Sequence, residues 1–343
     1  MDLAEALERV LRDDPARAPI DGLDAWWAGH LAAASGTPAP IARALLAGAA
    51  ADRPGYAFAS GLQEALAQLV GEPARRRWAL CASEEGGAHP RAIAATLRVA
   101  ADGWRLTGTK RWSTLASVAE ELLIVARLPA PAADDAARPR LAVVRVAADR
   151  PGVAVEATPP APFVPEIPHA IVTLTDVRVD ARERLPGDGY ARYLKPFRTI
   201  EDCFVHAALV AWAIQVGRRC SWPKEHIEAL AGLAVGLAGL AVADPRSPAV
   251  HLALAELRRR TASTAARARS GTASTRRPAS AGCETARSCA SPRGPASAAS
   301  RSPARRAPEA ACVRRAGGAP PGFSGDARDA GGTITQPRRR RPM

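Results

Sequence analysis

The spacing of hydrophobic residues divides the chain into successive regions. Up to about residue 76, large apolar residues recur every three or four positions, which predicts short helices separated by prolines. Over residues 77–183 the period shortens to two, and the predicted strands are WALCAS, AIAATLRV, WRLTGTKRWST, ELLIVARL, RLAVVRV, VAVEA and AIVTLTDVRV. Helical spacing returns over residues 184–260. We therefore predict an α+β fold: an N-terminal helical domain, a central β-domain of roughly six to eight strands, and a C-terminal helical bundle.

Three further segments complete this outline. Residues 129–139 and 159–168 are rich in proline and are predicted to be surface loops within the β-domain. The longest apolar run, residues 229–243, has about 15 residues, whereas a membrane-spanning helix needs roughly 20. We therefore expect a buried core helix there and no membrane span.

The last part of the chain has a different composition. Residues 261–343 contain sixteen arginines but no leucine or lysine, among mainly alanine, serine, proline and glycine. Such a segment has too few large apolar side chains to offset the conformational entropy lost on folding, so we predict a disordered, Arg-rich tail. A second interpretation is an out-of-frame reading of a GC-rich gene, which yields the same mixture of residues. Either interpretation leaves the helical bundle incomplete.

The net charge also changes at about residue 261. The tail has sixteen arginines and four acidic residues, so it carries +12 of the chain's net charge of +13. The remainder is close to neutral, which argues against a specific nucleic-acid surface. The first residues are acidic and amphipathic and lack the basic and apolar segments of a secretory signal, so we expect a cytoplasmic protein.

Cysteine and histidine are too dispersed to predict a metal site. The three cysteines before residue 261 form no CxxC pair, and the six histidines include no HExxH cluster. Trp26, Trp27 and His30 lie at helical spacing. This group fits either a packed aromatic core or the wall of a ligand pocket.

One segment carries a specific resemblance. GWRLTGTKRWSTLASVAEELLIVARL, residues 103–128, resembles the acyl-CoA dehydrogenase signature in which a strand pair ends in Trp-x-Thr and an aliphatic strand follows. WALCASEEGGAH, residues 78–89, is similar to that family's first flavin-facing strand and loop. LTDVRV, then PGDGY and a long helix, is similar in order and spacing. The resemblance covers about residues 60–260 and implies FAD as the cofactor.

The strand end at Trp112 offers the groups that a flavin site needs. In a regular strand, Trp112 and Thr114 face one side and Ser113 the other, so one face presents a flat ring beside a hydroxyl group. The resemblance implies that Trp112, Ser113 and Thr114 contact FAD. Taken without it, the same residues fit a core tryptophan beside a strand-end threonine.

Ser83 and Glu84 are similar to the Thr-Glu pair that ends the family's first flavin-facing strand, where hydroxyl and backbone groups contact the ring. The following residues depart from the family pattern, because its loop ends in Gly-Ser-Asp and this chain has EGGAHP at residues 85–90. Gly86 allows a close approach of the backbone to a phosphate, so we include it with Ser83 and Glu84 among the cofactor contacts. A plain surface turn explains these glycines equally well.

The resemblance also implies that a carboxylate removes the α-proton of an acyl-CoA while a hydride passes to N5 of FAD. Most members carry this base near the C-terminus in a Glu-Gly-Thr or Glu-Gly-Ser segment, which is absent here. A minority places it early in the first long helix after the sheet, where this chain has Glu201. The apolar residues around Glu201 predict a desolvated carboxyl with a raised pKa. The alternative is a glutamate that only complements the helix dipole.

Two classes of function follow from these residues. The first is an FAD-dependent acyl-CoA dehydrogenase-like oxidoreductase with an acyl-CoA substrate and an electron-transfer acceptor. The second is a degenerate, non-catalytic member that keeps the fold as a binding or scaffold protein, which the altered loop after Glu84 favours. With a complete C-terminal domain, the resemblance implies a homo-oligomer.

Overall fold

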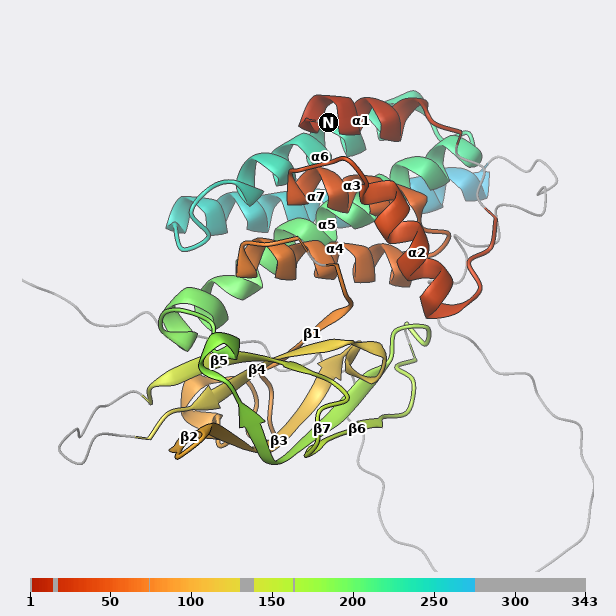
Figure 1. Ribbon diagram of the computed structural model, residues 1–343. Coiled ribbons are helices and arrows are strands. Elements are labelled where there is room, and N and C mark those ends of the chain that lie inside the picture. The colour runs from red at the N-terminus through yellow and green to blue at the C-terminus, as the bar shows by residue number, and fades with distance from the viewer. Residues whose placement is uncertain (1, 15–17, 74, 130–138, 163, 275–343) are drawn as a thin grey trace, which may run out of the picture. The chain divides into compact units, whose positions relative to one another are not determined.

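The computed structural model of the chain describes residues 2–14, 18–73, 75–129, 139–162 and 164–274. A layer of helices lies along one side of a β-sheet (Figure 1). The N-terminal helices are α1 (Leu3–Arg12), α2 (Gly22–Ala34), α3 (Pro40–Ala50) and α4 (Pro54–Val70). Asp2 and Glu5 form a capping box at the start of α1, and Gly71 ends α4 in the left-handed conformation. The predicted N-terminal helices are therefore present.

The sheet contains the strands that the period-2 pattern predicts. They are β1 (Trp78–Cys81), β2 (Thr96–Ala100), β3 (Gly103–Thr114), β4 (Glu121–Arg127), β5 (Leu141–Ala147), β6 (Val153–Ala157) and β7 (His169–Val179). The order is β1-β4-β2-β3-β7-β6, with β5 paired to the other side of β4. The half containing β4 joins the half containing β3 through a single pair, Thr96 and Arg127. The described residues of the predicted loop at 159–168 form no strand, and residues 130–138 of the other loop lie outside the described residues.

The C-terminal helices are α5 (Lys195–Arg219), α6 (Lys224–Ala241) and α7 (Pro248–Ser274). A π-helical turn, Gly189–Leu194, leads directly into α5. Helix α7 continues beyond residue 260, so the prediction of disorder is wrong for residues 261–274. That segment is rich in alanine, the residue with the highest helix propensity, and it extends a helix that is already formed. The rest of the predicted tail, residues 275–343, lies outside the described residues.

Helix α6 contains residues 229–241 of the apolar run for which the sequence predicts a buried core helix. One face is buried through Leu230, Leu233 and Leu237, whereas Val235 is 51% exposed. Among the described residues, a different stretch, Gly189–Arg219, is long and apolar enough to cross a membrane by length and composition alone. In that stretch 67% of the apolar window is buried within the protein, as in a core helix.

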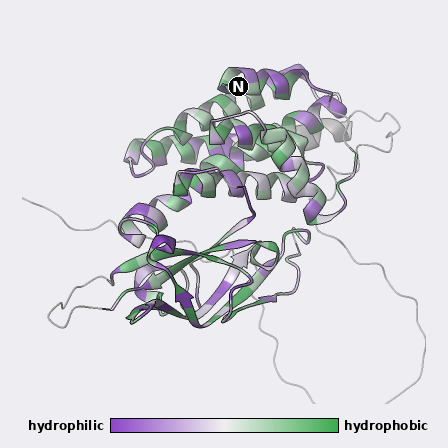
Figure 2. Ribbon diagram, in the orientation of Figure 1, coloured by the Kyte–Doolittle hydropathy of each residue, from purple (hydrophilic) through white to green (hydrophobic). Residues whose placement is uncertain are grey.

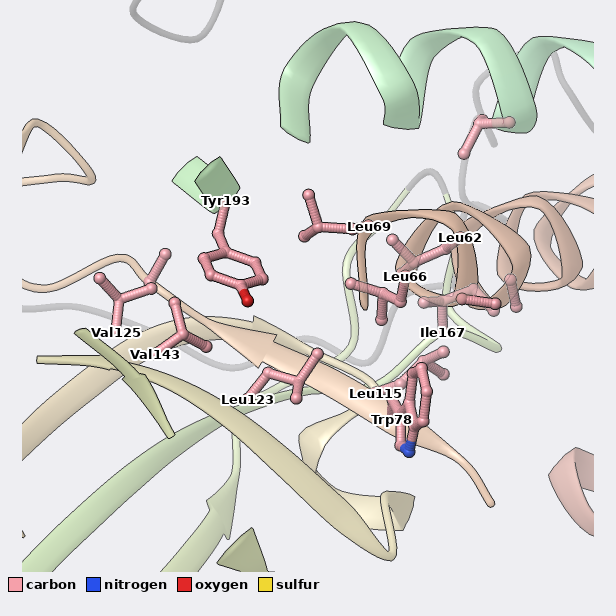
Figure 3. Close-up of a cluster of buried hydrophobic side chains, with 14 of the residues drawn as sticks. Leu62, Leu66, Leu69, Trp78, Leu115, Leu123, Val125, Val143, Ile167 and Tyr193 are labelled. Carbon is pink, nitrogen blue, oxygen red and sulfur yellow. The ribbon is translucent and has the colours of Figure 1, made fainter. Parts of the chain in front are cut away.

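Hydrophobic residues gather where the helices meet one another and the sheet (Figure 2). The core between α4 and the sheet contains Leu62, Leu66, Trp78, Leu123 and Tyr193, which point toward one another in Figure 3. A second core lies among the helices and contains residues of α1, α3, α5, α6 and α7. A third lies within the β-domain. Helix α5 contributes to both of the first two cores.

Close contact between α4 and α5 depends on a glycine. A Cβ atom placed on Gly61 of α4 would lie 2.6 Å from Cα of Val205 and 2.8 Å from the carbonyl oxygen of Phe204. Both atoms belong to the α5 backbone, so a side chain at position 61 forces the two helices apart. By contrast, no atom lies within 4 Å of the corresponding position on Gly232 of α6.

We expect Gly61→Ala to lower the free energy of unfolding by about 1–3 kcal/mol, the usual cost of overpacking a core. Gly232→Ala is the matched control, because it adds the same methyl group to a helix but in open space. Its expected effect is neutral or stabilising by up to about 1 kcal/mol, from the higher helix propensity of alanine. Urea denaturation of both variants measures the difference. Equal effects would contradict the close α4–α5 contact.

Candidate active site

The turn after β1 is held by backbone hydrogen bonds. Glu84 N donates to Gly87 O at 3.1 Å, and Gly87 N donates to Glu84 O at 2.9 Å. Gly87 has φ +91°, so the left-handed position in this turn is at residue 87. Gly86 is exposed, and a Cβ atom there would lie 3.1 Å from Cβ of Ala92. Ser83 is partly buried, and its carbonyl oxygen accepts a hydrogen bond from Arg111 N at 2.8 Å, which ties the turn to β3.

A buried ion pair fixes the same region from inside. The Nζ atom of Lys110 lies 2.6 Å from Oε1 of Glu84, and the two side chains are 0% and 8% exposed. The Glu84 carboxylate also accepts hydrogen bonds from the backbone N–H groups of Ala94 and Ala95, at 2.8 and 3.1 Å. Burial lowers the pKa of Lys110. Glu84 thus connects the end of β1, the segment before β2 and the middle of β3.

Strand β3 is irregular at Trp112, where a regular period of two residues predicts Trp112 and Thr114 on one face. Its pairing with β7 shifts between Lys110 and Ser113, so two residues of β3 stand opposite one residue of β7. At this bulge Trp112 adopts φ +57°, a left-handed conformation that typically costs a non-glycine residue about 1–3 kcal/mol. The Trp112 side chain is turned outward, and the residue is 68% exposed. The bulge therefore presents a large aromatic ring to solvent.

Ser113 and Thr114 lie in different environments. Ser113 is 2% exposed and its hydroxyl faces the Cys81 thiol, whose pKa burial raises to about 11. Thr114 is partly buried and pairs with His169 of β7. Thr114 is therefore partly open to solvent, whereas Ser113 is buried within the β-domain. The flavin contacts predicted for these residues stay predictions.

Glu201 lies in the second turn of α5, on a helix that is already continuous from Gly189. The helix dipole acts mainly on the first turn, so the interpretation of Glu201 as a dipole partner fails. Burial raises the pKa of its carboxyl to about 7, the direction that the sequence predicts. Arg198 and Asp202 act on it in opposite directions. Within the described residues, no hydrogen bond or ion pair engages the Glu201 carboxyl.

Helix α5 turns Glu201 toward the sheet side of the helical layer. The residues one helical turn before and after it, Phe197 and Val205, belong to the core that also contains Leu115 and Trp78. Leu115 directly follows Thr114, and Trp78 begins the strand that leads to Ser83. The same core thus links the helix of Glu201 to both strand ends that carry the predicted cofactor contacts.

Two polar groups beside these residues were not predicted from the sequence. Lys110 is the first, and its signal is a lysine inside an otherwise β-patterned run. Asp202 is the second: its carboxylate pairs with Arg258 of α7 at 2.9 Å and with Arg198 at 3.3 Å. The Asp202–Arg258 pair links α7 to α5 beside Glu201. Its partners are 56 residues apart, so local sequence gives no signal for it.

Comparison with known proteins identifies the sheet. Residues 79–177 match the family described as acyl-CoA dehydrogenase, middle domain. No curated protein sequence matches the chain. A solved FAD-dependent dehydrogenase has a TM-score of 0.61 at 17% identity and covers 79% of this chain and 86% of its own. The FAD complex of PigA has a TM-score of 0.55 at 12% identity, with coverages of 78% and 82%. A glutaryl-CoA dehydrogenase from Mycobacterium smegmatis has a TM-score of 0.51 at 18% identity, with coverages of 83% and 86%. These likenesses show a shared fold.

We expect Lys110→Met to lower the free energy of unfolding by about 3–5 kcal/mol, because it leaves the Glu84 charge buried and unpaired. The double variant Lys110→Met/Glu84→Gln is expected to recover about 2 kcal/mol of that loss. The amide is neutral, and its oxygen still accepts a hydrogen bond from the N–H groups before β2. Chemical denaturation of both variants measures the recovery. A double variant no more stable than Lys110→Met alone would show that the charge pair is not what holds this region.

Burial of Glu201 predicts a pH dependence of stability with a definite sign. Its pKa is about 7 in the folded chain, whereas an ordinary glutamate in an unfolded chain has a pKa of 4.5, so between these pH values only the unfolded chain loses the proton. Ionisation of Glu201 therefore costs stability as the pH rises from 4.5 to 7, by up to about 3 kcal/mol. Glu201→Gln removes that cost, so its stability relative to wild type is expected to increase from pH 4.5 to pH 8.

Denaturation curves at several pH values test this expectation. The matched control is Glu228→Gln on α6, whose side chain is 62% exposed, and its difference from wild type is expected to stay constant. If the Glu201→Gln difference is also constant with pH, the raised pKa is ruled out.

Proposed function

Because residues 79–177 form an acyl-CoA dehydrogenase middle domain, we propose that this chain is an FAD-dependent oxidoreductase that forms an α,β double bond in an acyl-CoA thioester. The resemblance of the motifs around Trp112 and Ser83 to the same family implies the same assignment. Both motifs fall within the matched range, residues 79–177, which supports the proposal. The proposal extends this match from the domain to the activity of the chain.

The observation that carries the proposal is the raised pKa of the Glu201 carboxyl together with its position on α5. A general base works best when its pKa lies near the working pH, and burial raises the pKa of Glu201 to about 7. The carboxyl has no competing partner within the described residues. It lies on the first long helix after the matched domain, on the side that packs toward the sheet. Such a group is available to take a proton from a substrate bound between helix and sheet.

The residues around the β3 bulge fit FAD. The exposed Trp112 ring offers a flat apolar surface, and Thr114 places a hydroxyl two residues farther along the strand. A tryptophan held outward by a left-handed backbone is a strained arrangement, and such strain is concentrated at functional sites. Trp112 and Thr114 would hold the ring, and the turn at Ser83 and Gly86 would lie against it. The carboxylate of Glu84 is engaged by Lys110 and its backbone pairs with Gly87, so Glu84 would hold this turn in place against the ring.

Each of these residues has its own role in the proposed reaction. Glu201 in its ionised form takes the α-proton of the thioester, and the apolar residues on either side of it exclude water. The Lys110–Glu84 pair keeps the bulge and the turn in register, so that Trp112 and Thr114 are positioned before substrate arrives. Bound FAD supplies the acceptor for the β-hydrogen, which leaves with its electron pair as the double bond forms.

Flavin reduction tests the proposal. The full chain, supplied with FAD, is expected to show flavin absorbance that bleaches when butyryl-, octanoyl- or palmitoyl-CoA is added without oxygen. Glu201→Gln is expected to keep the flavin spectrum and lose bleaching by at least about 100-fold in rate, because general acid–base catalysis contributes that much. Glu228→Gln, with its exposed side chain, is the control and is expected to bleach at the wild-type rate.

The outcomes separate the enzyme from a non-catalytic relative. A chain that binds FAD but is not bleached by any of these thioesters fits a binding or scaffold protein. If the Glu201→Gln variant is still bleached, the chain is an oxidoreductase but Glu201 is not its base. A chain that takes up no FAD contradicts the cofactor assignment itself.

A further inference from the structure

Arg111 occupies the bulge of β3 beside Trp112. The residues on either side of this pair, Lys110 and Ser113, are 0% and 2% exposed. Trp112 is 68% exposed, and Arg111 is partly buried. Arg111 and Trp112 are therefore the two neighbouring residues of the bulge that remain open to solvent.

The backbone fixes Arg111 between the two strand ends that carry the predicted cofactor contacts. Its N–H group donates to the carbonyl oxygen of Ser83 at 2.8 Å. Ser83 precedes the turn that Glu84 and Gly87 close, and Trp112 directly follows Arg111 in β3. The side chain of Arg111 therefore starts from a fixed point between Ser83 and Trp112.

The charge of Arg111 is not neutralised by its neighbours. The Glu84 carboxylate lies 2.6 Å from Nζ of Lys110 and accepts hydrogen bonds from two backbone N–H groups, so this pair is neutral in sum. Glu85, the next residue of the turn, is exposed, and no ion pair joins it to Arg111 in the part of the chain that the structure describes. One positive charge is therefore in excess beside Trp112.

The other partly buried arginines of the β-domain that the structure describes all have a partner for the guanidinium group. They are Arg77 with Asp24, Arg105 with Asp102, Arg145 with Glu72, Arg150 with Glu183, and Arg127 with the carbonyl oxygen of Arg91. Among the described residues of 77–183, Arg111 is the one partly buried arginine whose side chain has neither an ion pair nor a hydrogen bond. Removing a cation from water costs free energy unless a partner compensates, so the missing partner indicates an anionic ligand.

A ligand can reach the guanidinium group of Arg111. A nitrogen of this side chain that was both enclosed and unpaired would be a buried polar atom without a partner, and none of its nitrogens is one. By contrast, Nη1 of Arg105 on the same strand is enclosed and unpaired. The guanidinium of Arg111 is therefore accessible from solvent, although the residue as a whole is partly buried.

We propose that Arg111 binds a negatively charged group of FAD. This inference rests on the proposed function, which places the flavin ring against Trp112 and beside Ser83. FAD offers two such groups, its phosphates and its ring, which gains electron density on reduction. A guanidinium suits both, because it donates charge-assisted hydrogen bonds to phosphate oxygens and stabilises negative charge beside a flavin ring. Arg111 is thus a cofactor contact that the sequence motifs did not name.

Two measurements on the full chain with Arg111→Gln separate these groups. Titration with oxidised FAD, followed by flavin fluorescence, reports the phosphates, because they carry the charge of the oxidised form. If Arg111 binds a phosphate, the variant is expected to bind oxidised FAD at least about 10-fold more weakly. A redox titration of bound FAD reports the ring. If Arg111 stabilises the reduced ring about 10-fold, the variant's two-electron reduction potential is expected to be about 30 mV lower.

Three further variants control for charge and shape. Arg98→Gln removes the same charge from an exposed position on β2, outside the bulge, and is expected to keep the affinity and the potential of the wild type. Arg111→Lys keeps the charge and is expected to recover part of the effect, because lysine lacks the planar fork of donors. Arg111→Met keeps an apolar stem without the charge and is expected to behave as Arg111→Gln does.

The outcomes distinguish this inference from the proposed function. If the wild type binds FAD while Arg111→Gln and Arg111→Met change neither affinity nor potential, the inference is overturned and the proposed function stands. Equal changes in Arg98→Gln would also overturn it, because they would report net charge alone. A wild type that takes up no FAD would overturn both. An Arg111 effect on FAD in a chain that no thioester bleaches would support the inference and contradict the oxidoreductase activity.

Discussion

The structure depends on helix α5 packing against two different partners at once. One side of α5 joins the core among the helices, and another side joins the core against the sheet. At Gly61 the backbone of α4 lies directly against the backbone of α5, so α4 also contributes residues to both cores. Because α5 cannot shift without disturbing both cores, any residue on it is held firmly relative to the strands. Glu201 stands on the side toward the sheet, and this placement is what desolvates its carboxyl.

The hydrophobic period predicted the order of helices and strands, because each element buries one face and the pattern records that face. It missed the bulge at Trp112, since an extra residue in a strand depends on the partner strand and leaves no local trace. It predicted a core helix at α6 but not which face is buried, since an apolar sequence does not say how many neighbours a helix has. The end of α7 was missed because low hydrophobicity was weighed above the helix propensity of alanine.

For the candidate site, too, the sequence predicted some features and missed others. Sequence motifs named the strand ends around Ser83 and Trp112, and the pKa direction of Glu201 followed from its apolar neighbours. The partners that hold those residues were not visible, because Glu84 and Lys110 are 26 residues apart and meet only through the fold. Trp112 breaks local rules by pairing a large exposed ring with a left-handed backbone. Such local conflicts are expected where function outweighs stability.

The central claim is that the partly buried carboxyl of Glu201 removes an α-proton. Its most direct measurement is hydrogen exchange at the α-carbon of a bound acyl-CoA thioester in D₂O, followed by mass spectrometry, because exchange reports proton removal without requiring net oxidation. The account predicts α-deuterium incorporation that increases with pD as Glu201 ionises near neutrality, and its loss in Glu201→Gln. Exchange that is absent in the flavin-loaded wild type, or equally fast in Glu201→Gln, would contradict it.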